Sequence, residues 1–219
     1  MNLIKNAVAA LAVVLFPSFA VAAPWVVDSA HAQAKFTVKH MMVMDVVGTL
    51  GKVSGGIELD EKDPTKSVID VTVDVEPNTQ EAKRDGHLKG PDFFDVEKFP
   101  KATFKSKKIA KAGKDKFKVT GDLTLRDVTK ETTFDLTLTA PFEHPFTKAP
   151  VRAVTATTKI NRLDFGLKWQ APMANNALLV GNDVKIELAA EITPKPAEGA
   201  EAAKEEPKKE EAKPAPAKK

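Results

Sequence analysis

The feature that most constrains the fold is an alternation of apolar and polar residues with a period of two. Near the end of the alternating region, Val184, Ile186 and Leu188 alternate with Lys185 and Glu187. Successive side chains of a β-strand point to opposite faces of its sheet. The pattern therefore predicts strands with one apolar face and one solvated face.

Eight segments of the chain follow this alternation. Five are clear, at 34–40, 69–76, 117–125, 134–140 and 184–192, and three are weaker, at 46–59, 101–109 and 151–160. Short turn segments separate the strands, among them Gly55-Gly56 and 127–130, as hairpins require. We predict an all-β domain of about eight antiparallel strands, which can form a sandwich or close into a barrel.

Residues 78–100 interrupt the alternation. This segment is polar at first and then aromatic, and Gly86, Gly90 and Pro91 punctuate it. We predict two short helical turns joined by a loop, which cover one end of the sheet as a lid. A connection of this length within a meander usually has a function.

The two ends of the chain differ from the domain between them. Residues 1–22 combine Lys5, an apolar stretch and small residues up to Ala22, which predicts a secretory signal peptide cleaved after Ala22. Residues 194–219 are rich in Pro, Ala, Lys and Glu, which predicts a solvated, disordered tail. We therefore expect an exported protein with one domain at 23–193.

Composition excludes several classes of function. The chain has no Cys, so it has no thiol nucleophile, thiolate metal ligand or disulfide. Its formal net charge is +3, which gives no support for a nucleic-acid partner.

Several motifs, in a fixed order, cover residues 25–192. They are WVVD (25–28) with His31, FTVKHMMV (36–43), RDGHL (84–88), DFFD (92–95), GDLTLRDVTK (121–130), INRLDFG (160–166) and VGNDVKIEL (180–188). In these motifs the chain resembles the YceI-like family of periplasmic lipid- or polyisoprenoid-binding proteins, which have a lipocalin-like barrel.

The resemblance implies a hollow barrel whose apolar tunnel binds an isoprenoid chain, such as a polyprenyl lipid or a quinone. Burial of each methylene unit gains about 0.8 kcal/mol, so such a tunnel needs few polar contacts. The predicted ligand-binding residues are inward side chains of the strands and two aromatic residues of the lid: Phe36, Val38, His40, Phe104, Phe117, Val119, Leu123, Phe134, Leu136, Phe93 and Phe94. The same residues could fill a packed, stress-related barrel without a ligand, and periodicity does not distinguish the two.

Some polar residues have two interpretations. Arg84, Asp85 and His87 in the lid, and Arg162 and Asp164 near the last strand, either brace the chain or contact a ligand head group. His40 lies on an apolar face, where a lone His is more often a hydrogen-bonded core residue than a ligand.

We predict no catalytic or metal site. Asp28-Ser29-Ala30-His31 contains residue types found in hydrolases, but no nucleophile elbow or oxyanion-hole motif accompanies it. The run from His40 to Met44 offers soft ligands for Cu(I), yet in a strand Met41 would point away from His40 and Met42. An enzyme that acts on a lipid-like substrate through His40, His87 or Asp85 is the alternative.

The segment from Lys98 to Lys118 is strongly basic, with Asp115 as its single acid. Lys residues on an edge hairpin discourage aggregation. The same residues could instead dock the protein on an anionic membrane surface. The sequence is also compatible with a homodimer.

Overall fold

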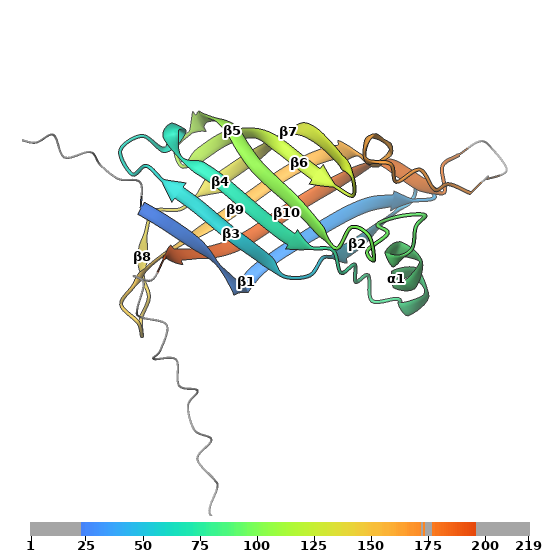
Figure 1. The fold of residues 1–219 in the computed structure, drawn as a ribbon, viewed down its shortest axis with the longest axis horizontal. Helices are drawn as coiled ribbons and strands as arrows, with labels where there is room; N and C mark the ends of the chain where they lie inside the picture. Colours follow the sequence, from blue (N-terminus) through green and yellow to red (C-terminus); the bar gives the residue numbers. More distant parts are fainter. Residues whose placement is uncertain (1–22, 172, 174–176, 196–219) are drawn as a thin grey trace, which may run out of the picture.

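The computed structural model describes residues 23–171, 173 and 177–195 (Figure 1). The predicted signal peptide at 1–22, and the predicted tail beyond Lys195, lie outside these residues. No helix in the described ranges has the length and apolar character to cross a membrane.

The described residues form ten strands, one α-helix and two short 3-10 helices. The strands are β1 (Ala23–His40), β2 (Met44–Thr49), β3 (Val53–Leu59), β4 (Val68–Asp74), β5 (Lys101–Gly113), β6 (Lys116–Leu125), β7 (Val128–Leu138), β8 (Phe142–Glu143), β9 (Pro150–Asn161) and β10 (Val180–Pro194). The helices are η1 (Pro64–Lys66), α1 (Ala82–Lys89) and η2 (Arg162–Phe165).

Eight of these strands close into an antiparallel barrel, so the predicted fold class is confirmed. Neighbours follow the order β10-β1-β3-β4-β5-β6-β7-β9, and β9 pairs back with β10. That last pairing runs from Asn161 opposite Asp183 to Arg152 opposite Ile192. The first part of β1 pairs with β3 and its last part pairs with β2.

The alternation in the sequence correctly identifies the faces of the strands. In β6, for example, Phe117, Val119 and Leu123 are buried, whereas Lys116 and Lys118 are exposed. Burial of the apolar face inside a closed wall removes it from water, and closure also leaves few unpaired strand edges. The barrel is therefore the arrangement that satisfies both requirements of the pattern.

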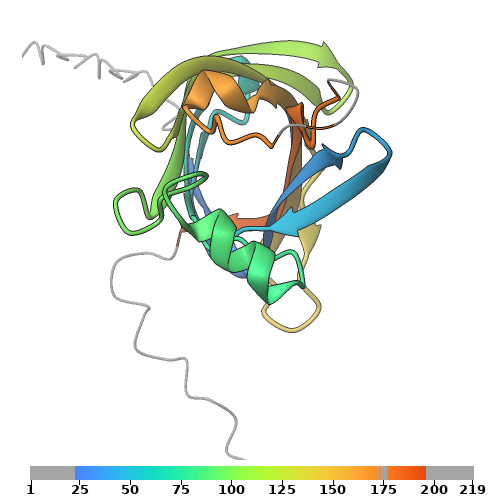
Figure 2. The ribbon, with the colours of Figure 1, turned by 90° about the vertical axis from the view of Figure 1, so that its right-hand side faces the viewer.

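The barrel has two different ends. We call the end that carries α1 and the β1–β2 turn the open end; Figure 2 looks into it. At the other end, which we call the packed end, large apolar side chains from several strands fill the interior: Trp25, Leu59, Ile109, Phe117 and Leu138.

The prediction of a turn at Gly55-Gly56 is wrong, because both residues lie within β3. Gly55 has a left-handed φ of 106°. A Cβ atom on Gly56 would lie 2.1 Å from the backbone oxygen of Trp25. These glycines therefore permit a bend and a close approach of β3 to β1, the other common use of glycine in a strand.

The predicted lid contains one helix, and the expectation of two helical turns is only partly right. Helix α1 ends at Lys89 with Gly90 as its C-cap, and Pro91 has no backbone N–H with which to continue it. A hydrogen-bonded turn follows, in which the N–H groups of Phe93 and Asp95 donate to the Gly90 carbonyl at 3.1 and 2.9 Å.

The basic segment is only partly an edge hairpin. Residues Lys101 to Lys105 pair with β4 on one side, while β6 pairs with β5 along its length on the other. Because β5 begins beside the lid and runs away from it, the β5–β6 turn lies at the packed end (Figure 1). The basic tip is thus remote from the open end.

Candidate functional site

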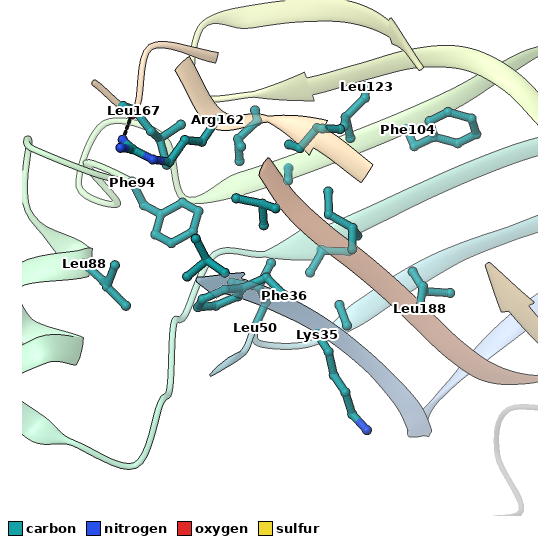
Figure 3. A pocket seen from close by; sticks show the side chains of 18 of the residues that line it. Lys35, Phe36, Leu50, Leu88, Phe94, Phe104, Leu123, Arg162, Leu167 and Leu188 are labelled. Atoms are coloured by element: carbon teal, nitrogen blue, oxygen red, sulfur yellow. Dashed lines mark hydrogen bonds between the residues drawn. The ribbon is translucent and has the colours of Figure 1, made fainter. Parts of the chain in front are cut away.

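The barrel contains an apolar cavity of about 520 Å³, lined by side chains from every strand of the barrel wall (Figure 3). It reaches the surface at the open end, beside the exposed residues Glu81 and Lys83. Cavities of several hundred Å³ with apolar walls and few polar groups are typical of sites for small apolar ligands. The interior is therefore hollow, which disagrees with the alternative of a filled core.

Ten of the eleven residues predicted to bind ligand line this cavity: Phe36, Val38, His40, Phe93, Phe94, Phe104, Val119, Leu123, Phe134 and Leu136. The exception is Phe117, which belongs to the packed end. Phe117 has the predicted inward orientation, but it lies too far along β6 to reach the cavity. The role of the other ten in ligand binding stays a prediction.

Other lining residues were not selected from the sequence, and some of them lie in the segments whose alternation is weaker. They come mainly from β3, β4, β9 and β10, and include Ile57, Ile69, Val71, Ile160, Ile186 and Leu188. Their inward faces follow from the same period of two. The prediction favoured aromatic residues and so missed many of the aliphatic residues of the wall.

Two aromatic residues of the lid enter the open end. Phe93 and Phe94 are both buried, and the Phe94 ring lies 6.1 Å from that of Phe36 in an edge-to-face contact. Arg126, in the turn between β6 and β7, donates to the Phe93 carbonyl at 3.0 Å and to the Gly166 carbonyl at 3.1 Å. Arg126 thus ties the lid and η2 to the barrel wall.

His87 belongs to an aromatic cluster at the cavity wall. Its ring contacts those of Phe93 and Trp169 edge-on, at centroid distances of 5.0 and 5.1 Å. Its Nε2 atom lies 2.9 Å from a carboxylate oxygen of Asp92. The His87 ring is therefore held in place by an acid on one side and two aromatic rings on the other.

Arg84 and Asp85 meet at Thr79, just before α1. The backbone N–H and hydroxyl of Thr79 donate to Asp85 Oδ1 at 2.8 and 2.5 Å. Arg84 donates from Nε to Thr79 Oγ1 at 2.7 Å and from Nη2 to the Thr79 carbonyl at 3.0 Å. The hydrogen bond from the Thr79 hydroxyl lowers the pKa of the Asp85 carboxyl. This geometry braces the lid, and Arg84 also lines the cavity.

Arg162 is a buried cation beside the cavity. Its guanidinium donates to the carbonyls of Gly181 at 2.9 Å and Val180 at 3.2 Å, and also to that of Leu167 (Figure 3). Burial lowers the pKa of Arg162 from its usual value. Asp164, the other candidate in this motif, lies in the first turn of η2 and is not among the cavity-lining residues.

Asp28 and His31 come together with Glu191 on the outer face of the barrel, where β1 bulges against β10. His31 Nδ1 lies 2.9 Å from Asp28 Oδ2 and 4.0 Å from Glu191 Oε2. The hydrogen bond to Asp28, and the charges of both acids, raise the pKa of His31. The ligand atoms of this trio lie within 4.8 Å of one another, but the contact between His31 and Asp28 explains their proximity as an exposed ion pair.

The argument against a copper site at His40 to Met44 assumed a continuous strand, and this assumption is wrong. The strand ends at His40, and Met41 and Met42 form a turn with left-handed φ values of 49° and 62°. Of the three residues of the enzyme alternative, His40 and His87 line the cavity, whereas Asp85 is engaged with Thr79.

The chain was compared with known proteins, and residues 25–192 match the model of the YceI-like domain. A UPF0312 protein of Staphylococcus aureus (strain MSSA476) is 34% identical over 169 residues, which cover 76% of this chain and 95% of that protein. The crystal structure of BcnA from Burkholderia cenocepacia shares the fold, with a TM-score of 0.65, 23% identity, and coverage of 75% of this chain and 98% of that one.

A solved polyisoprenoid binding domain from Saccharophagus degradans, implicated in plant cell wall breakdown, also shares the fold. Its TM-score is 0.55 at 14% identity, over 80% of this chain and 99% of that one. These likenesses extend along the whole barrel, and the family expected from the motifs is confirmed. The chain belongs to the YceI-like family.

Proposed function

We propose that this protein binds and carries a polyisoprenoid or a similar long apolar amphiphile inside its barrel. The observation that carries the proposal is the apolar cavity of about 520 Å³, whose lining includes residues of the lid at the open end. The barrel wall would shield an apolar chain in this space from water, and its opening would face the lid. The proposed action is sequestration, without a covalent step.

The energetics of such binding are favourable. Burial of ten methylene-sized units gains about 8 kcal/mol, at about 0.8 kcal/mol for each unit. That free energy corresponds to a dissociation constant of about 1 μM before the costs of association are subtracted. Because these costs amount to several kcal/mol, a useful affinity requires a longer buried chain or added contacts to the head group.

The polar groups at the open end set the proposed orientation of the ligand. Arg84 and His87 of the lid line the cavity, and Arg162 lies in the wall. A phenol, quinone or phosphate head group can accept hydrogen bonds from these side chains. We therefore propose that the ligand's head group lies near the lid and that its chain points toward the packed end.

Two further considerations support the ligand class and the compartment. The Saccharophagus degradans domain with the same fold is described as polyisoprenoid-binding. The signal-peptide pattern at residues 1–22 supports a periplasmic location. In this proposal the protein takes its cargo outside the cytoplasm, where free isoprenoid chains are insoluble.

Mass spectrometry of an organic extract tests this function directly. Protein purified from its native periplasm should release an isoprenoid-type lipid in a fixed ratio to protein, because an open apolar cavity gains free energy by retaining its chain. Delipidated protein should then rebind a prenyl phenol added back. Native protein that yields no lipid, and that binds no added prenyl compound, would contradict the proposal.

A further inference from the structure

The turn between β1 and β2 presents an unusual row of exposed apolar side chains at the open end. Met42, Val43 and Met44 are exposed by 51%, 76% and 66%. The turn is nevertheless fixed: Met41 N–H donates to the Leu179 carbonyl at 2.8 Å, and Val43 N–H to the His40 carbonyl at 3.1 Å. We call residues 41–44 the apolar tip. Figure 2 shows this hairpin projecting from the barrel wall.

The apolar tip continues the surface of the cavity. Val38 and His40 of β1, and Val46 of β2, line the cavity wall. Met44 lies two residues before Val46 and therefore shares its face of the strand. An apolar path thus leads from the interior to the exposed tip. A path of this kind allows an apolar chain to leave the barrel without crossing water.

The rim around this path carries a small excess of positive charge, since Lys39 pairs with Asp45 at 3.0 Å, and Lys83 and Arg84 stand against the single acid Glu81. Lys83 and Arg84 of α1 line the cavity opening. The acid among the nearby lining residues, Glu81, caps the helix by accepting hydrogen bonds from the backbone N–H groups of these two residues, at 3.1 and 2.6 Å. The rim therefore presents cations next to an apolar projection, which is the combination that binds anionic lipid surfaces.

We propose that the apolar tip inserts into an anionic lipid bilayer and holds the open end against the membrane while cargo passes. This inference rests on the proposed function and names where the cargo is exchanged. A second copy of the chain is a poorer occupant, since two open ends would bring like charges together. The β5–β6 basic turn lies at the other end, so in this proposal the lysines of that turn do not face the membrane.

The chain offers a matched control at the packed end. Phe146, in the loop between β8 and β9, is exposed by 88%. Phe146 does not line the cavity, and the loop beside β8 that carries it lies at the end of the barrel opposite α1 (Figure 1). Val43→Asp and Phe146→Asp therefore each add one charge at an exposed apolar position, at opposite ends of the barrel.

The test is cosedimentation of the protein with vesicles of phosphatidylglycerol and phosphatidylcholine, and with vesicles of phosphatidylcholine alone. We expect wild type and Phe146→Asp to bind the anionic vesicles equally well. Val43→Asp should bind them about tenfold less, because it replaces a buried apolar contact with a charge. Added salt should weaken the binding of all proteins, since the rim charges are screened.

Binding of a prenyl phenol in vesicle-free solution is measured on the same three proteins. Equal binding by all three shows that Val43→Asp is folded and that its defect lies in docking. Absence of prenyl binding in all three overturns the proposed function, whatever the vesicles show. Three results would overturn the docking inference: Val43→Asp sediments with anionic vesicles like wild type, Phe146→Asp is the variant that loses vesicle binding, or wild type does not bind anionic vesicles.

Discussion

The two ends of the barrel start from the same alternation and reach opposite results. At the packed end, side chains as large as Trp25 and Phe117 leave a void of only about 20 Å³. Toward the open end, residues of the same strands surround about 520 Å³. The difference shows that the alternation with a period of two decides which side chains face inward. Side-chain size and chain connections decide whether the interior is filled.

The largest expected effect separates the two ends by stability. Leu138 at the packed end and Leu123 at the cavity wall are both 8% exposed. Leu138→Ala should cost about 3–5 kcal/mol of unfolding free energy, because it opens a new cavity in a filled core. Leu123→Ala should cost about 2 kcal/mol or less, since its side chain already borders empty space.

Urea denaturation of the ligand-free proteins measures this difference. The affinity for prenyl phenol should show the opposite pattern. Leu123→Ala should change this affinity, and Leu138→Ala should leave it unaltered. Equal stability losses for the two variants would mean that the wall near Leu123 is as tightly packed as the packed end. That result would contradict the proposed difference in packing between the two ends.

The next effect concerns the attachment of the lid. Arg126→Met keeps the bulk of the side chain but removes the hydrogen bonds to the Phe93 and Gly166 carbonyls. Loss of these charged hydrogen bonds should cost about 2 kcal/mol. Hydrogen exchange should therefore accelerate in the turn after α1, and bound prenyl phenol should dissociate faster. Unchanged exchange in that turn would show that Arg126 does not hold the lid.

A smaller effect should make the lid sensitive to acid. The pKa of Asp85 is lowered in the folded protein by its hydrogen bond from Thr79. The stabilisation is therefore present above the ordinary carboxyl value of about 3.9 and is lost as the pH falls through the lowered, folded-state pKa. Hydrogen exchange of the Thr79 amide, followed against pH, should show this loss in wild type. Asp85→Asn should abolish the pH dependence, and a persistent dependence would point to another group.

The smallest effect lies outside both ends, at the exposed ion pair of His31. Its pKa is raised by Asp28 and Glu191, so its contribution to stability is complete below about pH 6.5 and is lost as the pH rises through the raised value. NMR titration of the His31 ring should give a midpoint that falls in Asp28→Asn. Prenyl binding should remain unchanged across this titration, whereas coupled changes would place His31 in the binding mechanism.

The sequence predicted much of the fold because alternation and pairing obey local geometry. Phe36, Phe104 and Phe134 could be placed on the cavity wall because period two fixes their face. Phe117 could not be distinguished from them, since its distance from the cavity depends on how deeply the packed end fills. The error at Gly55-Gly56 arose because a turn and a strand bulge favour the same residue.

The parts that escaped prediction depend on contacts between distant residues. Arg126 sits in a charged turn that resembles any hairpin, and its partners lie 33 and 40 residues away. Trp169 lies outside the alternating segments, so no pattern in the sequence marks it. Its ring contact with His87 depends on the path of the chain after η2. The lid was predicted from its irregularity, but the residues that attach it emerged only from the structure.

If the cavity holds an apolar chain, a large side chain introduced into the cavity should prevent that chain from binding. Ala156 lines the cavity, whereas its neighbour Thr155 is exposed on the outer face of β9. Ala156→Trp should therefore occupy the space that the ligand needs, and Thr155→Trp should leave that space intact.

The measurement is titration of both delipidated variants and wild type with a prenyl phenol. Ala156→Trp should lose binding by more than about tenfold while staying folded, and Thr155→Trp should bind like wild type. Equal binding by a folded Ala156→Trp would show that the ligand lies outside this cavity.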